Sequence, residues 1–187
     1  SGMPTHAIAA RGLVRTFQST TLFQELTVLD SVLAGRHLHA RVDPLRALLG
    51  ADRGRQAAAR DKALEILDFF GLAERRDELA MSLPHGLQRA LGIAVAFAAE
   101  PALLLLDEPF TGMNPEETRR MMEIARRVQK HGVTILLVEH DMQAVMGLCD
   151  RITVLNFGTL LAEGAPEEVR RHPDVIEAYL GAAAGAA

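Results

Sequence analysis

The chain has 187 residues, of which 49% are hydrophobic, and its formal net charge at pH 7 is −4. This length suits one domain with a real core, and no apolar run approaches the roughly 20 residues needed to cross a bilayer. The interspersed charges argue against a nucleic-acid surface, where a basic stripe is expected. The single cysteine, Cys149, excludes an internal disulfide and fits a reducing compartment. We expect it to be a small buried residue rather than a nucleophile.

The N-terminal half is predicted to be mostly helical. A short helix over residues 4–10 leads into a strand at 13–18, where apolar and polar positions partly alternate. Thr27 and Asp30 have the spacing of a capping box, which starts a helix through about residue 39. Residues 42–55 read as a loop with a short helix, and apolar residues at helical spacing predict a helix over 56–70. Residues 27–98 are therefore expected to be nearly all helix.

The second half predicts alternating strands and helices. A buried strand at 103–106 is followed by Asn114 as an N-cap and a helix to residue 130, and then by an apolar strand at 133–138 that runs into His140. Asp141 can cap the next helix. Strands at 151–156 and 159–162 suggest a hairpin, and helices near 166–171 and 173–180 precede a tail predicted to be disordered. This order predicts an α/β fold with parallel crossovers.

One stretch organises the chain chemically: four leucines followed by Asp107, Glu108 and Pro109. Such an apolar run is typical of a strand buried on both faces, and Pro109 forbids the strand to continue. The carboxyl end of a strand in an open α/β sheet is where ligands bind. Adjacent carboxylates there suit a divalent metal that carries phosphates, with the second acid orienting a water. The alternative is a core strand that runs into a solvated acidic turn.

Five stretches, in order, resemble the nucleotide-binding ATPase of ABC transporters: Phe17-Gln18 (Q-loop), residues 83–88 (signature motif), Asp107-Glu108 (Walker B acid and catalytic glutamate), residues 111–114 (D-loop) and His140 (switch histidine). The segments around residues 15–37 and 175–181 further resemble ATPases of branched-chain amino acid importers. The resemblance implies a partial P-loop NTPase fold, in which a RecA-like parallel sheet carries a helical subdomain. The implied division is core strand 1–26, helical subdomain 27–98, core 99–163, and C-terminal helices with the tail 164–187.

The resemblance also implies roles for individual residues. Asp107, with Gln18, would serve the Mg²⁺ of Mg-ATP; Glu108 would orient the attacking water, and His140 would contact the γ-phosphate or that water. Contacts to nucleotide held by the opposite subunit of a head-to-tail dimer would come from Leu83, His85, Gly86, Leu87, Gln88 and Asn114. Pro84 and His85 depart from the usual Ser and Gly, so phosphate contact would rest on Gly86 and neighbouring amides, with His85 as a further candidate.

The sequence contains no G-x-x-x-x-G-K-[ST] pattern, the P-loop that such phosphoryl transfer needs. We therefore expect the chain alone neither to bind nor to hydrolyse ATP. In the family the P-loop strand lies between the switch-histidine strand and the strand after it, so residues 133–138 should present an unpaired, apolar edge. A fragment, a mis-started reading frame or a self-associating chain would each account for this.

The partners that the resemblance implies are membrane-spanning permease subunits, a second ATPase subunit and, indirectly, a periplasmic solute-binding protein. The implied location is the inner face of the cell membrane, reached through the permease. Two alternatives remain open. One is a non-catalytic module that acts through protein contacts, and the other is a non-transport ABC ATPase, which the lack of a basic stripe disfavours.

Overall fold

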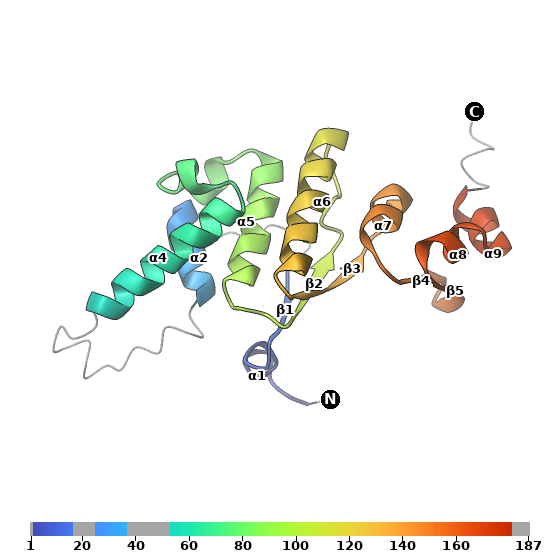
Figure 1. The fold of residues 1–187 in the computed structure, drawn as a ribbon, viewed down its shortest axis with the longest axis horizontal. Coiled ribbons are helices and arrows are strands. Elements are labelled where there is room, and N and C mark those ends of the chain that lie inside the picture. Colours follow the sequence, from blue (N-terminus) through green and yellow to red (C-terminus); the bar gives the residue numbers. More distant parts are fainter. Residues whose placement is uncertain (1, 17–24, 37–52, 181–187) are drawn as a thin grey trace. The chain divides into compact units, whose positions relative to one another are not determined.

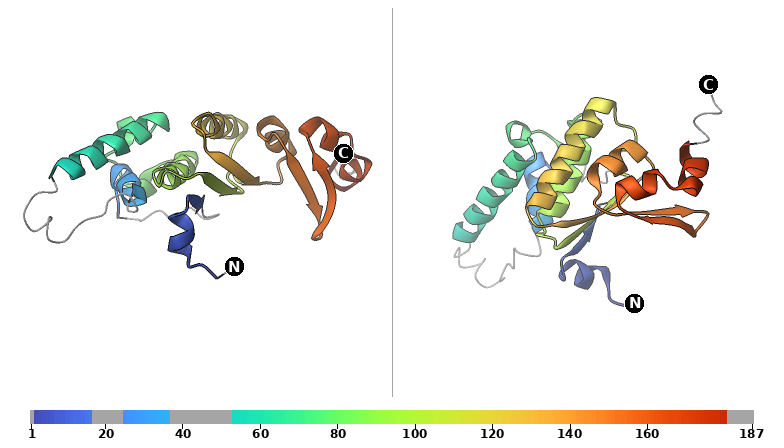
Figure 2. Two further views of the ribbon diagram at one scale, coloured as in Figure 1. Left: turned by 60° about the horizontal axis from the view of Figure 1, so that its bottom comes forward. Right: turned by 45° about the vertical axis from the view of Figure 1, so that its right-hand side comes forward.

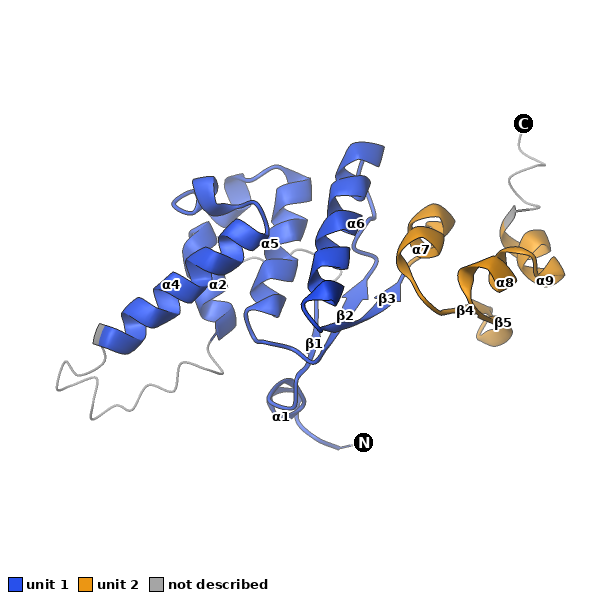
Figure 3. Ribbon diagram, viewed as in Figure 1, with its two compact units in different colours: residues 1–138 blue, residues 139–187 orange. Residues whose placement is uncertain are grey.

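The computed structural model describes residues 2–16, 25–36 and 53–180. The chain forms two compact units, residues 1–138 and 139–187, which Figure 3 shows in different colours. Within the described residues, no helix combines the length and the apolar character that crossing a membrane requires.

The first unit is built on a parallel sheet of three strands: β1 (Leu13–Arg15), β2 (Leu103–Asp107) and β3 (Thr134–Val138). β2 lies in the middle, with Leu13 opposite Leu103 and Asp107 opposite Val138. The predicted parallel α/β architecture is confirmed here. Among the described residues β3 pairs only with β2, so the expected edge at this strand is also present.

The two faces of this sheet differ in burial. Leu104 and Leu106 are 0% and 1% exposed, whereas Leu103 and Leu105 are only half-buried. On the same face as Leu105, Leu136 and Val138 of β3 are 51% and 49% exposed. The prediction of a strand buried on both faces was therefore wrong. An apolar run does not determine which elements cover each face of the strand. Here one face packs into the core and the other remains partly open to solvent.

Helices gather at one end of the first unit, where α2 (Val28–Gly35), α4 (Arg53–Phe69) and α5 (His85–Phe97) pack together (Figures 1 and 2). Thr27 caps α2 as predicted, accepting from the amide of Asp30 at 3.1 Å. Gly35 allows α2 to approach α5 closely, because a Cβ there would lie 2.3 Å from the carbonyl oxygen of Val95. Short 3-10 turns at Ala73–Arg75 and Ala80–Ser82 link α4 to α5, and α1 (Thr5–Ala9) precedes β1.

Several predicted bounds shift. α2 ends at Gly35 rather than near residue 39, and α4 begins at Arg53. Most of the loop expected at 42–55 lies outside the described residues, as do residues 17 and 18 of the predicted first strand. The structure does not test the four-part domain division, which stays a prediction.

Helix α6 (Pro115–Lys130) follows β2 and connects it to β3. Its start matches the prediction: the side chain of Asn114 accepts from the amides of Glu116 and Glu117, and the carboxylate of Glu117 accepts from the amide of Asn114. Beyond its other end, the His131 ring meets the stacked rings of Phe69 and Phe97 edge-on, beside a cavity of about 490 Å³. These rings join the helical end of the unit to the sheet.

The second unit has its own small core. It contains α7 (Met142–Leu148), the antiparallel hairpin of β4 (Ile152–Asn156) and β5 (Thr159–Gly164), α8 (Pro166–Arg170), α9 (Pro173–Val175) and a π-helical turn, Ile176–Leu180. Ile152, Val154, Ala162, Val169 and Val175 are buried together. The hairpin is confirmed. However, the last predicted helix divides into two short pieces, and β4 pairs with β5 in a separate antiparallel sheet, so the expected parallel crossover leading to β4 was wrong.

Cys149 lies beside this core and is half-buried. Burial, with a smaller effect from the neighbouring Asp150 carboxylate, raises the pKa of its thiol. Because the thiolate is the nucleophilic form, this agrees with the expectation of a packed rather than a reactive cysteine.

Candidate functional site

The two carboxylates of the candidate site emerge where β2 ends. Asp107 is the last residue of the strand, and its side chain is 18% exposed. The guanidinium of Arg15 on β1 donates to Asp107 Oδ2 at 2.6 Å. Arg15 is level with Leu105 in the parallel register, so Asp107 lies two residues further along on the same sheet face. In this state the charge of the candidate metal carboxylate is neutralised by an arginine.

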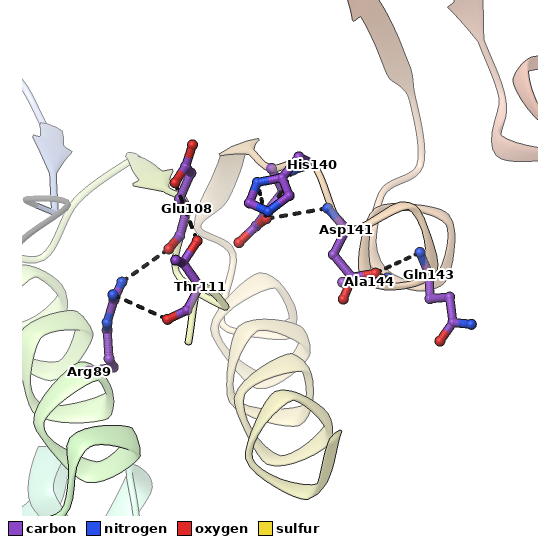
Figure 4. A network of polar contacts seen from close by, with 8 residues as sticks. Arg89, Glu108, Thr111, His140, Asp141, Gln143 and Ala144 are labelled. Atoms are coloured by element: carbon purple, nitrogen blue, oxygen red, sulfur yellow. Dashed lines mark hydrogen bonds and ion pairs between the residues drawn. The ribbon is translucent and has the colours of Figure 1, made fainter. Parts of the chain in front are cut away.

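Glu108 stands in an unusual backbone conformation. Its φ is +46°, in the left-handed region that L-residues with a side chain rarely adopt. Three hydrogen bonds from two neighbouring elements hold the turn: Glu108 donates its amide to Val138 O at 2.8 Å, and Arg89 of α5 donates to Glu108 O at 3.0 Å and to Thr111 O at 3.3 Å (Figure 4). Thr111 Oγ1 also donates to Glu108 Oε2 at 3.3 Å. These contacts turn Glu108 away from the strand direction of Asp107.

The predicted signature stretch forms the start of α5. The helix begins at His85, with Pro84 as N-cap. Pro84 O already accepts from the amides of Leu87 and Gln88 at 2.9 and 3.0 Å. The amides of His85 and Gly86 come before that of Leu87, the first amide that donates within the helix, so they are the donors that this helix end offers.

Two of the candidate residues in this stretch have structural contacts. Leu83 is 3% exposed and belongs to the core. The side-chain amide of Gln88 donates to Leu83 O at 2.8 Å and to Met81 O at 3.1 Å. Both residues therefore shape the entry into α5, whatever else they contact.

The starts of α5 and α6 lie next to each other. A Cβ at Gly86 would be 2.9 Å from Glu117 Oε1, and a Cβ at Gly112 would be 3.9 Å from His85 Cε1. Gly112 has φ +78°, and Asn114 caps α6. The structure thus brings His85, Gly86 and Asn114 into one neighbourhood within the first unit.

His140 belongs to the second unit and lies two residues after the end of β3 in the sequence. Its imidazole is 69% exposed, whereas the side chain of the preceding Glu139 is only 1% exposed. Glu139 Oε2 accepts from the amide of His140 at 3.0 Å and lies 3.7 Å from His140 Nδ1 (Figure 4). Asp141 caps α7 as predicted, accepting from the amides of Gln143 and Ala144. The buried carboxylate therefore fixes the backbone that presents the imidazole.

Gln18 lies outside the described residues. Three residues that sequence reasoning did not select contact the candidates: Arg15, Arg89 and Glu139. A basic residue three positions before the Q-loop glutamine, a basic residue directly after the signature stretch, and an acid next to the switch histidine are signals that could have indicated them.

The residues at the end of β2 can be compared with what a metal needs. Within the part of the chain that the structure describes, no three His, Cys, Asp or Glu side chains form a group that could hold an ion by themselves. Mg²⁺ is usually bound through one or two carboxylates together with substrate phosphates and water. A lone strand-end carboxylate such as Asp107 fits a magnesium ion that arrives on a phosphate, and does not make an independent metal centre.

Comparisons with known proteins agree with the family resemblance seen in the sequence. A family model described as "ABC transporter" matches residues 3–111, and one described as "Branched-chain amino acid ATP-binding cassette transporter" matches residues 159–185. The chain is 45% identical over 185 residues to the high-affinity branched-chain amino acid transport ATP-binding protein LivG of Salmonella typhimurium, with 97% of this chain and 72% of that protein covered. To BraF of Pseudomonas aeruginosa, described in the same words, it is 43% identical with the same coverage.

Solved structures agree. The ADP conformation of MJ1267, an ATP-binding cassette of an ABC transporter, superimposes with a TM-score of 0.78 at 27% identity, covering 97% of this chain and 73% of that one. A nucleotide-free ATP-binding cassette from an ABC transporter also gives a TM-score of 0.78 at 27% identity, covering 95% and 72%.

Proposed function

The chain belongs to the ATP-binding proteins of ABC transporters, and on this premise we propose that it serves as the ATPase subunit of an importer for branched-chain amino acids. The observation that carries the proposal is the 45% identity to LivG across 97% of the chain. The match of residues 159–185 to the branched-chain amino acid transporter model supports the same substrate class. Such a subunit works with permease partners at the inner face of the membrane and with a second ATPase subunit.

The geometry suggests how the residues divide the work. Asp107 would meet magnesium-bound phosphate, exchanging the Arg15 guanidinium for the ion. Bound Mg²⁺ supplies charge neutralisation on the phosphate oxygens. Glu108 would orient and polarise the attacking water, a role worth about 10² to 10⁴ in rate for general bases. His140, on a backbone anchored by Glu139, would hydrogen-bond the γ-phosphate or the water.

The start of α5 would face the nucleotide of the opposite subunit. The amides of His85 and Gly86 suit a phosphate oxygen, because helix N-termini offer free donors and a favourable dipole. Asn114, capping α6 beside them, would join this surface. Gln18 would sense metal and water in the family's manner. Leu83 and Gln88 would support the helix start more than touch the nucleotide, given their contacts within the chain, and Leu87 would remain a candidate nucleotide contact.

These 187 residues carry no P-loop pattern, so we propose that they supply the carboxylate and signature parts of an ATP site. Mg-ATP titrations of the 187-residue chain should show no specific affinity. In the full-length product of the gene, Glu108→Gln should lower the turnover number by about 10² or more and leave Mg-ATP affinity unchanged. Full turnover in Glu108→Gln would remove the role of Glu108, and a full-length product without ATP binding would overturn the proposed function.

A further inference from the structure

Arg89 joins the helix of the signature stretch to the turn that carries the candidate catalytic glutamate. It follows residues 83–88 directly, and its half-buried side chain leaves α5 toward the end of β2. Its Nη1 donates to Glu108 O at 3.0 Å and its Nη2 to Thr111 O at 3.3 Å, so a single guanidinium spans both ends of a four-residue turn (Figure 4). Its Nε is buried and meets no hydrogen-bond partner among the described residues.

The turn between these two carbonyls needs support. A left-handed conformation is unfavourable for a residue with a side chain, and Glu108 has φ +46°. Backbone strain of this kind persists only where surrounding contacts over-determine it. Here those contacts are the Glu108 amide on Val138 O, the Thr111 amide on Glu108 O at 3.4 Å, and the two donations from Arg89.

Arg89 is suited to this task by its chemistry. Hydrogen bonds from a charged group are stronger than neutral ones, and the planar guanidinium fixes two acceptors in one plane. Both acceptors are backbone carbonyls, so the contact specifies the position of the chain rather than the charge of a side chain. If Arg89 is removed, both carbonyls lose their charged donor, although Glu108 O keeps the Thr111 amide at 3.4 Å, and the turn is freer to relax toward an ordinary φ.

We propose that Arg89 is a positioning residue that holds the turn from Glu108 to Thr111, and thereby sets the direction of the Glu108 carboxylate from the signature helix. The inference rests on the proposed function for its catalytic consequence, but the geometric part stands on the described contacts alone. Arg89 touches neither nucleotide nor water in this role.

Hydrogen exchange on the 187-residue chain tests the geometric part. The amides of Glu108 and Thr111 are both hydrogen-bonded, so their exchange reports whether the turn stays closed. In Arg89→Ala these amides should exchange about fivefold faster or more, while amides in the middle of α6 keep their rates. Arg120→Ala is the matched control, because Arg120 is an exposed arginine paired with Glu116 within α6. Unchanged exchange at Glu108 and Thr111 in Arg89→Ala would overturn the proposal.

Kinetics of the full-length product test the catalytic part. Arg89→Ala should lower kcat about tenfold or more with KM for ATP within about twofold, because misplacement of a reacting group affects the transition state more than substrate binding. Arg89→Lys, which keeps one charged donor, should recover part of the loss. A wild-type kcat in Arg89→Ala would overturn the proposal while leaving the proposed function intact.

Failure of the proposed function and failure of the Arg89 proposal would give different results. If the wild-type full-length product hydrolyses no ATP, the proposed function fails, and hydrogen exchange still decides whether Arg89 holds the turn. If Arg89→Ala loses structure broadly, the α6 amides will also exchange faster, and Arg89→Lys then serves as the test variant. Arg89→Lys should lower kcat while the α6 amides exchange at the wild-type rate. A wild-type kcat in Arg89→Lys would then overturn the proposal.

Discussion

Substituting Gly86 by alanine tests the close approach of α5 and α6. The new Cβ would lie 2.9 Å from Glu117 Oε1, closer than such atoms can remain, so the carboxylate must move. That carboxylate also stabilises the start of α6, because its other oxygen accepts from the amide of Asn114 at 3.0 Å as one half of the α6 capping box. The clash therefore reaches the start of a second helix.

The magnitude follows from two opposing effects. Alanine is favoured over glycine inside a helix by about 0.5–1 kcal/mol, and losing a cap costs about 0.5–2 kcal/mol. Gly92 lies in the same helix, but a Cβ there would meet nothing within 4 Å. We expect Gly92→Ala to raise the free energy of unfolding by about 0.5–1 kcal/mol, and the free energy of unfolding of Gly86→Ala to be lower than that of Gly92→Ala by about 0.5–2 kcal/mol.

Urea unfolding followed by far-ultraviolet circular dichroism measures both variants on the same chain. A second pair, Gly86→Ala and Gly92→Ala in a Glu117→Ala background, removes the carboxylate that obstructs the methyl group. In that background Gly86→Ala should no longer be less stable than Gly92→Ala. Equal stabilisation by Gly86→Ala and Gly92→Ala in the wild-type background would refute the reasoning, because it would mean that Glu117 does not hold its place.

Two further predictions concern one strained turn residue and one ion pair. Phe157 is fully exposed at the hairpin tip, just before Gly158, and has φ +46°. Because a hairpin turn of this kind favours Asn-Gly, Phe157→Asn should relieve left-handed strain and raise the free energy of unfolding by about 0.5–1 kcal/mol in urea unfolding, whereas Phe157→Ala keeps the strain and should give no such gain. The Arg15–Asp107 pair should show a coupling of about 0.5 kcal/mol in a double-mutant cycle of Arg15→Gln and Asp107→Asn, since Arg15 is 58% exposed; additive effects would mean that the pair is not formed in solution.

Local signals in the sequence predicted local structure well. The start of α6 is predicted by groups that lie next to each other in the chain: Asn114, Pro115 and the two acids that follow. The helix begins there. The hairpin at residues 156–159 is signalled in the same way, by Asn156 and Gly158 between two apolar runs. Such features need no knowledge of the rest of the fold.

Features that depend on distant segments could not be predicted. The Arg15–Asp107 pair joins strands that are 92 residues apart, and it requires their register. The left-handed Glu108 has no signal in its residue type, because the strain is sustained by Arg89 and Val138 from other elements. The half-open face of β2 likewise depends on what covers the sheet, which four leucines cannot specify.

The capping role of Asn114 limits what this residue can offer a ligand. A carbonyl oxygen has two lone pairs, and Oδ1 of Asn114 already accepts from two amides, those of Glu116 and Glu117, both at 3.0 Å. Only the Nδ2 group can then serve an incoming molecule, and it can only donate. Asn114 is therefore suited to recognise an acceptor, such as a phosphate oxygen or a partner's carbonyl, and unsuited to ligate a cation. A ligand that demanded its oxygen would have to unwind the first turn of α6.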